Sequence, residues 1–195
     1  SEVYTDGENT ASYDAALTAT GCEKAAAFVN FCNAFEIPVL TLVNVDGYKN
    51  CKCNEKKIAK AAARLTYAFA NADVPKVTVV VGKANGTAGL TMNSKSIGSD
   101  IVYAWKNAKI GVMEAAPAVK IMYADEIAKA DNAAALINEK AAQYNEMQAS
   151  ALAAAKRGYV DDIIEASETR QRVVAAFEML FTKREGRPSK KHGTI

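Results

Sequence analysis

The stretch that most limits the fold of this chain is residues 74–113, in which an apolar strand leads into a small-residue turn and a helix. Residues 77–81 are all valine or threonine, a β-branched run that predicts a buried strand. A turn over residues 82–89 precedes a short helix, and strand-like segments follow at residues 100–105 and 109–113. Strands that alternate with helices in this way predict an α/β fold with mostly parallel strand pairing.

The turn Gly82-Lys83-Ala84-Asn85-Gly86-Thr87-Ala88-Gly89 is the best candidate for a functional site. The first backbone N–H groups of a helix have no partner within the helix. A turn without bulky side chains therefore lets an anion approach them, or an oxygen that becomes negative during a reaction. An alternative interpretation needs no ligand, because small residues also let a helix pack closely against a sheet, and such turns are common in α/β folds.

The other segments predict a single domain over residues 21–195, preceded by a polar strap or short edge hairpin over residues 1–20. Apolar spacing predicts a helix at residues 21–35, and a β-branched run that ends at the turn signal Asp46-Gly47 predicts a strand at 39–45. Asn54 is expected to cap a helix at 55–72. From about residue 114 the chain is expected to be a helical extension, with helices at residues 115–127, 133–156 and 167–181. Gly158 is the expected C-cap of the second of them. The aromatic residues expected to pack inside the fold are Tyr67, Phe69, Phe177 and Phe181.

Composition and charge exclude some classes of function. The 195 residues carry a formal net charge of +2, which gives no reason to expect a nucleic-acid partner. No apolar run reaches the roughly 18–20 residues that span a bilayer, and no charged-then-apolar leader is visible. We therefore expect no membrane insertion and a cytoplasmic location.

The four cysteines, Cys22, Cys32, Cys51 and Cys53, do not match a metal site. Zinc takes four ligands, usually from paired spacings. The Cys51-Lys52-Cys53 motif has no second pair, and the one histidine, His192, is far along the chain. We expect no bound metal, and reduced thiols with a mostly structural role.

Several motifs, in order, resemble one protein family: VPKVTVVVGKA, a G-x-A turn, M-x-SK, DIVYAW, AKIGVM, AAKRGYVDDII and KREGRPSKKHGTI. The family is the acyl-CoA carboxyltransferase subunits of biotin-dependent carboxylases and decarboxylases, such as the β subunit of propionyl-CoA carboxylase. The similarity extends from about residue 21 to residue 195 and falls in the C-terminal half of that subunit. It implies a crotonase-like (ClpP/crotonase) α/β fold, a spiral of ββα units with a helical C-terminal extension.

The resemblance also implies a function. In this family the C-terminal type of domain receives carboxybiotin, which a biotin carrier protein presents, and the N-terminal type of domain binds the acyl-CoA substrate. The implied reaction transfers CO₂ between carboxybiotin and an acyl-CoA, and the freed ureido nitrogen of biotin takes the α-proton. The protein supplies N–H donors to the negative charge. By position these are the backbone amides of Thr87 and Ala88, with Gly86 permitting close approach and Asn85, Gly89 and Leu90 lining the biotin site.

The chain departs from the family pattern at the same turn. The family usually has tyrosine at the positions of Asn85 and Gly89, an acidic or polar residue at Leu90, and proline at Lys106. Two aromatic walls are thereby removed from the biotin site. Two alternatives therefore stand beside the carboxyltransferase: a catalytically impaired or engineered self-assembling trimeric subunit, and a crotonase-like acyl-CoA hydrolase.

The implied partners are further copies of this chain, as a trimer or a dimer of trimers, together with an acyl-CoA-binding half and the biotin carrier. The basic tail over residues 183–195 either meets phosphates of CoA or a partner's acidic surface, or forms a solvated arm; its cations are Lys183, Arg184, Arg187, Lys190 and Lys191. Tyr103 and Trp105 either line a pocket or face the core, since an alternating strand more often buries one face.

Overall fold

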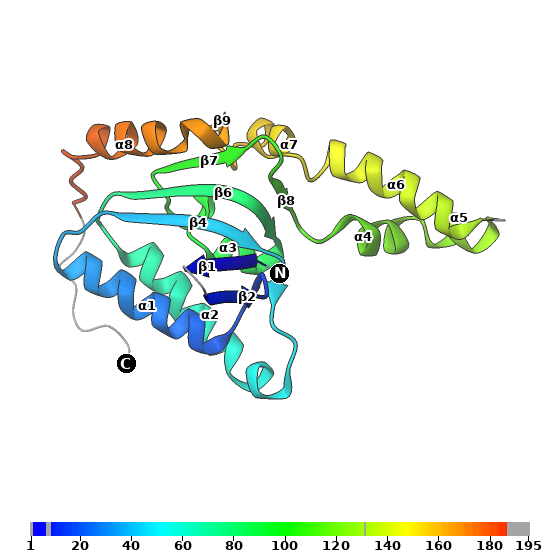
Figure 1. Ribbon diagram of the computed structural model, residues 1–195, viewed down its shortest axis with the longest axis horizontal. Coiled ribbons are helices and arrows are strands. Elements are labelled where there is room, and N and C mark those ends of the chain that lie inside the picture. Colours follow the sequence, from blue (N-terminus) through cyan, green and yellow to red (C-terminus); the bar gives the residue numbers. More distant parts are fainter. Residues whose placement is uncertain (1, 7–8, 131, 187–195) are drawn as a thin grey trace.

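A parallel five-stranded sheet forms the centre of the fold (Figure 1). The computed structural model describes residues 2–6, 9–130 and 132–186. Within the sheet the strand order is β4-β6-β7-β9, and β8 pairs with the far end of β6. The strand bounds are β4 Val39–Val45, β6 Lys76–Asn85, β7 Ile101–Trp105, β8 Lys109–Gly111 and β9 Asp162–Ile164. The expected α/β architecture with parallel pairing is confirmed.

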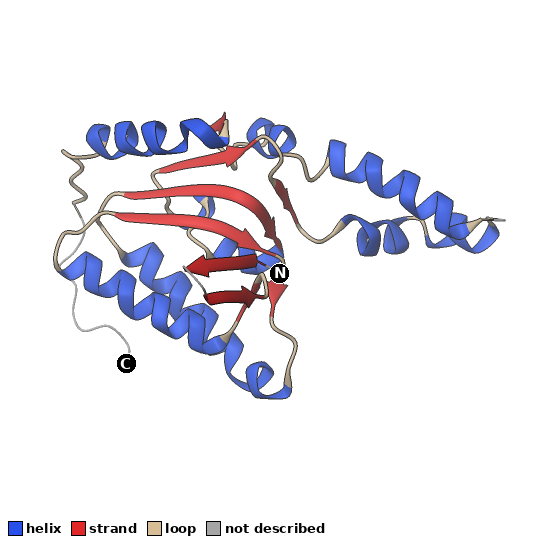
Figure 2. Ribbon diagram, viewed as in Figure 1, coloured by secondary structure: helices blue, strands red, loops and turns tan. Residues whose placement is uncertain are grey.

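Helices cover the two faces of the sheet unequally (Figure 2). The long helices α1 (Ala19–Ala34) and α2 (Lys52–Asn71) lie together on one face, and their apolar residues form a core with Val39 and Val74. The single helix α8 (Thr169–Met179) lies on the other face and packs on Val77 and Val79 of β6. No helix among the described residues covers the edge strand β4 on this second face, where Leu40 and Leu42 are exposed.

Short strands precede α1. β1 (Glu2–Asp6) and β2 (Asn9–Tyr13) form an antiparallel hairpin, one of the two forms expected for the N-terminal segment. β3 (Ala16–Leu17) pairs in parallel with β5 (Gly47–Tyr48), which follows β4. This second pairing fixes the segment before α1 beside the turn that leaves β4.

A helical arm projects away from the sheet (Figure 1). It consists of α4 (Ala115–Met122), α5 (Ala124–Lys129) and α6 (Ala133–Met147). No residue of α5 or α6, both of which lie in the described part of the chain, is buried. The chain then returns to the sheet through α7 (Ala151–Lys156). Short 3-10 helices lie at Lys95–Ile97 and Ala166–Glu168.

The helix predicted over residues 133–156 is broken, and the strand β8 explains why. Ile110 N donates to Ala149 O at 2.8 Å, and Lys109 forms an isolated bridge with Ser150. The backbone between α6 and α7 is therefore extended to pair with β8, and Ser150 caps α7 by accepting from Ala153 N at 3.1 Å. Gly158, with a φ of +79°, ends this region in the left-handed conformation expected of a C-cap.

The predicted cap of α2 is wrong. The helix begins at Lys52, and Asn54 lies inside its first turn, 5% exposed. The Asn54 side chain instead accepts from Ala19 N at 2.6 Å and donates to Lys49 O at 2.7 Å. The Asn54 side chain therefore bonds to Ala19, a residue distant in sequence, instead of capping its own helix. Local residue spacing does not reveal such a contact.

Strand β6 is longer than expected because it continues through Gly82 to Asn85. The pairing with β4 shifts between Val43 and Val45. At this irregularity the side chain of Asn44 accepts from Lys83 N at 2.9 Å. A Cβ on Gly82 would lie 2.4 Å from Asn44 Oδ1. Gly82 therefore does not start a turn. It leaves space for the Asn44 side chain, which accepts the hydrogen bond that a backbone carbonyl of β4 would otherwise accept.

Two of the four aromatic residues expected inside the fold are exposed. Phe69 is buried, and Phe177 points from α8 into the core between this helix and the sheet, as predicted. Tyr67 and Phe181 are 53% and 81% exposed. Helical spacing identified the elements but not which of their faces the rest of the chain covers.

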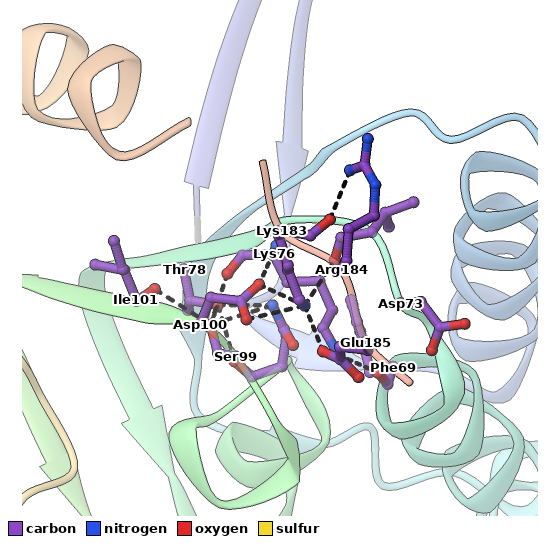
Figure 3. A network of polar contacts seen from close by, with 12 residues as sticks. Phe69, Asp73, Lys76, Thr78, Ser99, Asp100, Ile101, Lys183, Arg184 and Glu185 are labelled. Atoms are coloured by element: carbon purple, nitrogen blue, oxygen red, sulfur yellow. Dashed lines mark hydrogen bonds and ion pairs between the residues drawn. The ribbon is translucent and has the colours of Figure 1, made fainter. Parts of the chain in front are cut away.

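A largely buried polar network connects the segment that follows α8 to the sheet (Figure 3). Lys76 is fully buried, and its Nζ donates to Phe69 O at 2.7 Å. Asp100 accepts from the backbone N–H of Lys76 at 2.8 Å and pairs with Lys183 at 2.9 Å. Lys183 also pairs with Glu185 at 2.7 Å. Lys183 is thus an anchoring residue and not a free cation for a phosphate, while Arg187, Lys190 and Lys191 lie outside the described residues.

In the described ranges, no helix is both long enough and apolar enough to cross a bilayer.

Candidate active site at the first turn of α3

The turn singled out in the sequence begins a six-residue helix, α3 (Gly86–Thr91). Gly86 has a φ of +57°, a conformation that favours glycine. A Cβ at this position would also lie 3.0 Å from Val112 O, in the segment that follows β8. Both observations require a residue without a side chain where β6 ends and α3 starts.

The amides of Thr87 and Ala88 lie in the first turn of α3, where the helix itself supplies no acceptor. Asn85 occupies the N-cap position but its side chain makes no capping hydrogen bond. Thr87 is exposed, whereas Ala88 is 1% exposed. The arrangement keeps the first-turn donors free of a local cap, so they can serve an external oxygen.

A cavity of about 560 Å³ adjoins this turn. Its walls are mainly apolar and come from the sheet, including Val80, Val102 and Ile110. Polar groups from three separate segments complete the rim: Ser94, Lys95, Ser96, Tyr144, Gln148, Arg157 and Tyr159. An apolar cavity with a few polar groups at its rim is typical of a small-molecule site.

Ser94 is the most informative polar group of this cavity. Its Oγ is buried and has no hydrogen-bond partner among the described residues. A buried hydroxyl without a partner carries a desolvation cost of about 1–3 kcal/mol, which a ligand's polar atom would remove. A rotation that turned this hydroxyl into the cavity would let a ligand supply the missing partner, which makes Ser94 a candidate ligand contact.

The cations of the first cavity already have partners. Lys95 Nζ lies 2.7 Å from Asp161 Oδ2 and donates to Asp100 O at 2.9 Å. Arg157 donates to Gln148 O at 2.9 Å and to the Gln148 side chain. These contacts fix the cavity wall between β7, α6 and α7.

A second cavity of about 400 Å³ lies at the same turn. Gly86, Thr87 and Val112 line both cavities, while Asn85 and Ala88 line only the second. The turn therefore stands between two hollows, and a group bound in either one would lie next to the start of α3.

Lys83 joins the elements around the second cavity. Its Nζ lies 2.8 Å from Asp46 Oδ1, after β4, and 3.0 Å from Glu114 Oε1, at the start of α4. The hydrogen bonds to Asp46 and then to Glu114 raise the pKa of Lys83 above its ordinary value. All three side chains are partly exposed, so the pairs position the elements more than they stabilise the fold.

The structure brings all six sequence-predicted site residues to these cavities. Gly86, Thr87, Gly89 and Leu90 line the first, and Asn85 and Ala88 line the second. At Gly89, a Cβ would lie 2.7 Å from the Ala84 carbonyl carbon, so this glycine lets α3 pack directly on β6. The close-packing interpretation thus applies to Gly89, while the free donors belong to the preceding residues.

Several lining residues were not singled out from the sequence as site residues. Ser94 and Lys95 belong to the M-x-SK motif, and Arg157 and Tyr159 to AAKRGYVDDII, so the motifs contained a signal for them. No signal in the sequence pointed to Tyr144 and Gln148, because the break between α6 and α7 is what brings these two residues to the cavity. Tyr103 and Trp105 belong to the core under α8, and Trp105 Nε1 donates to Thr169 Oγ1 at 2.8 Å.

No three histidine, cysteine, aspartate or glutamate side chains gather as metal ligands anywhere in residues 2–6, 9–130 and 132–186. His192 lies outside these ranges.

The chain is similar to a family described as "Carboxyl transferase domain", whose model matches residues 10–195. A relative named putative propionyl-CoA carboxylase beta chain, from Bacillus subtilis (strain 168), is 44% identical over 92% of this chain and 36% of its own length. The methylmalonyl-CoA carboxyltransferase 12S subunit of Propionibacterium freudenreichii subsp. shermanii is 42% identical over 92% of this chain and 34% of its own length. This chain spans about a third of the length of these relatives.

Solved structures agree with this grouping. The transcarboxylase 12S crystal structure, described as a hexamer assembly with methylmalonyl-coenzyme A and methylmalonic acid bound, aligns with a TM-score of 0.87 at 42% identity, over 92% of this chain and 35% of that one. The β subunit of Pseudomonas aeruginosa geranyl-CoA carboxylase aligns with a TM-score of 0.73 at 28% identity, over 90% of this chain and 34% of that one. The neighbours are carboxyltransferases of crotonase-like fold, so the expected fold is confirmed.

Proposed function

This chain belongs to the carboxyl transferase domain family, and we propose that it is the carboxybiotin-binding half of a biotin-dependent acyl-CoA carboxyltransferase. The observation that carries the proposal is the uncapped first turn of α3, with Gly86 at a φ of +57° and a cavity on each side. Residues 21–195 would act as one functional domain, with residues 1–20 as a separate strap. A cytoplasmic location remains a prediction.

The residues at the turn fit the group that the proposal places there. Biotin combines an apolar side chain with a polar ureido group. The first cavity offers apolar strand walls together with the unpartnered Ser94 hydroxyl. The amides of Thr87 and Ala88 add donors that no side chain caps.

When bound, carboxybiotin supplies CO₂ and leaves a ureido oxygen on which negative charge develops. The Thr87 and Ala88 amides would donate to that oxygen, and Gly86 would let it approach. A donor of this kind contributes roughly 2.7–4 kcal/mol to lowering a barrier in well-studied enzymes. Because the donors are backbone groups, the loss of the family's tyrosines at Asn85 and Gly89 changes the shape of the site but not its charge stabilisation.

The proposal requires partners, since this chain covers only about a third of its relatives. We propose that an acyl-CoA-binding half, a biotin carrier protein and further copies of this chain complete the enzyme. The exposed leucines of β4 and the unburied helices α5 and α6 provide surfaces for such contacts.

The test compares two variants at one residue. Thr87→Pro removes one first-turn N–H, at a position where a helix tolerates proline. Thr87→Ala removes the side chain and keeps the N–H. We expect calorimetry to show that the wild-type chain and Thr87→Ala bind biotin with similar affinity. The affinity of Thr87→Pro should be about 3- to 10-fold lower, because one hydrogen bond is lost.

Equal binding by the two variants would show that the amide is not a donor to the ligand. No binding of biotin, or of a biotinylated carrier, to the wild-type chain at millimolar concentration would overturn the proposed function. If the chain hydrolysed acetyl-CoA without biotin, the hydrolase alternative would replace it. If the chain assembled but neither bound biotin nor hydrolysed acetyl-CoA, the structural-subunit alternative would replace the proposed function.

A further inference from the structure

The start of α2 carries a pair of thiols that the proposed function does not use. The sulfurs of Cys51 and Cys53 lie 2.9 Å apart, within hydrogen-bonding distance. Cys53 is exposed and Cys51 partly so, whereas Cys22 and Cys32 are buried in the core between α1 and α2. The pair is therefore accessible to a small molecule from solvent.

The backbone holds the two thiols together. Cys51 is the N-cap of the 20-residue helix α2, with an extended φ of −153°, and Cys53 lies in its first turn. Cys51 O accepts from Asn54 N at 2.9 Å and from Glu55 N at 3.0 Å. The buried side chain of Asn54 pins this corner to Ala19 and Lys49. Because the corner is fixed on several sides, the sulfurs meet without a search through other conformations.

The two thiols differ in acidity. The hydrogen bond from Cys53 lowers the pKa of Cys51, and the Asn54 amide and Lys49 lower it further. The same hydrogen bond raises the pKa of Cys53. A thiol at a helix N-terminus is commonly a stronger acid than a free one. Cys51 is therefore the more acidic thiol of the pair and Cys53 the less acidic one.

The surroundings favour disulfide chemistry over metal binding. No third cysteine, histidine or carboxylate joins the pair to form a ligand group among the residues that the structure describes. The two sulfurs are also in direct contact, so forming a disulfide bond of roughly 2.05 Å requires only a small further approach.

We propose that Cys51 and Cys53 form a redox-active dithiol that exchanges with small-molecule disulfides. The Cys51 thiolate attacks one sulfur of the disulfide R–S–S–R, forming a Cys51–S–S–R bond and releasing one thiolate. Cys53 loses its proton and attacks the Cys51 sulfur, which forms the Cys51–Cys53 disulfide and releases the second thiolate. Two electrons pass from the dithiol to R–S–S–R, and the two cysteine protons end on the two released thiols.

The first experiment uses the wild-type chain and oxidised glutathione. We expect peptide mapping by mass spectrometry to find a Cys51–Cys53 disulfide, with a mass lower by two hydrogen atoms, while Cys22 and Cys32 remain reduced as internal controls. A stable glutathione adduct on either thiol, a disulfide between two chains, or no reaction of the folded protein would overturn the proposal.

Two matched variants test the assigned roles. In Cys53→Ser the serine hydroxyl still donates to Cys51 but cannot resolve the adduct, so the glutathione adduct at Cys51 should accumulate. In Cys51→Ser the remaining thiol lacks activation and should react about tenfold more slowly. Equal rates for the two variants, or faster reaction of Cys51→Ser, would show that the thiols are independent.

Discussion

At the scale of single residues, Gly86 combines a positive φ with a close contact to the backbone of another segment. Its φ of +57° disfavours any other residue, and Val112 O stands where a Cβ would go. Gly158 offers the matched comparison, because it has a φ of +79° but nothing lies within 4 Å of the point that its Cβ would occupy. The two glycines separate backbone strain from steric contact.

We expect Gly86→Ala to destabilise the protein more than Gly158→Ala does. Both changes place alanine at a positive φ, which costs roughly 1–2 kcal/mol. Only Gly86→Ala also pushes against Val112 O, so it should lower the free energy of unfolding further and weaken biotin binding. Urea unfolding would measure the change in stability, and calorimetry the change in biotin binding. If both variants lost the same free energy of unfolding, the segment after β8 would accommodate the added methyl group without strain.

Much of the site could be predicted at this scale because its parts are adjacent in sequence. Gly86, Thr87 and Ala88 lie in one turn, and the reason for the glycine is local. Ser94 was not identified as a site residue, since whether a hydroxyl lacks a partner depends on every neighbour. The misassigned Asn54 shows the same limit: its amide is satisfied by Ala19, 35 residues away.

At the scale of elements, Asp100 connects three segments that are distant in sequence. It accepts from the backbone of β6 and pairs with Lys183, whose side chain is only 10% exposed. Lys183 also reaches Val74 O, at 3.3 Å, so the segment after α8 is fastened across the end of the sheet (Figure 3). Removing the carboxylate would leave a mostly buried cation with less compensation.

We expect Asp100→Asn to lower the free energy of unfolding by about 1–3 kcal/mol, the usual cost of an under-satisfied buried charge contact. Asp14→Asn is the control, because Asp14 pairs with Lys49 at an exposed site and should change stability by less than about 1 kcal/mol. Urea denaturation would compare them. If both variants lost the same small amount, the network in Figure 3 would be no stronger than a surface pair.

Element boundaries followed the sequence where the cause was local. The β-branched run in residues 39–45 predicted β4 with its observed bounds. The break between α6 and α7 was missed because alanine-rich residues favour a helix there, and only pairing with β8 overrides that preference. Strand β9 was also missed, since three residues that complete a parallel sheet have no period of their own.

At the scale of the whole molecule, the edge strand β4 leaves apolar side chains exposed on the sheet face that α8 covers elsewhere. Leu40 and Leu42 of β4 are 43% and 55% exposed. Their pairing partners on β6, Val77 and Val79, are fully buried beneath α8. Since the same sheet face is covered on one side and bare on the other, we expect a second chain or the missing half of the enzyme to cover it.

We expect Leu42→Lys to reduce self-association, because a charge would be buried in the contact. Light scattering should show a mass above the 20.8 kDa of one chain for the wild type and a lower mass for the variant. Ala63→Lys, on the exposed side of α2, is the control and should leave the mass unchanged. A monodisperse wild-type monomer would refute self-assembly, and an unaffected variant would locate the contact elsewhere.

The helical arm has a consequence for how assembly and ligand binding are related. α4 begins directly after Glu114, whose carboxylate holds Lys83 beside the second cavity. Because α5 and α6 bury no residue of their own and contact mainly α4 and each other, a surface that covers them would add to their local stability. A partner that orders the arm therefore also orders one wall of the candidate site. If the partner raises the affinity of the site for its ligand in this way, thermodynamic linkage requires that the ligand raises the affinity for the partner by the same factor.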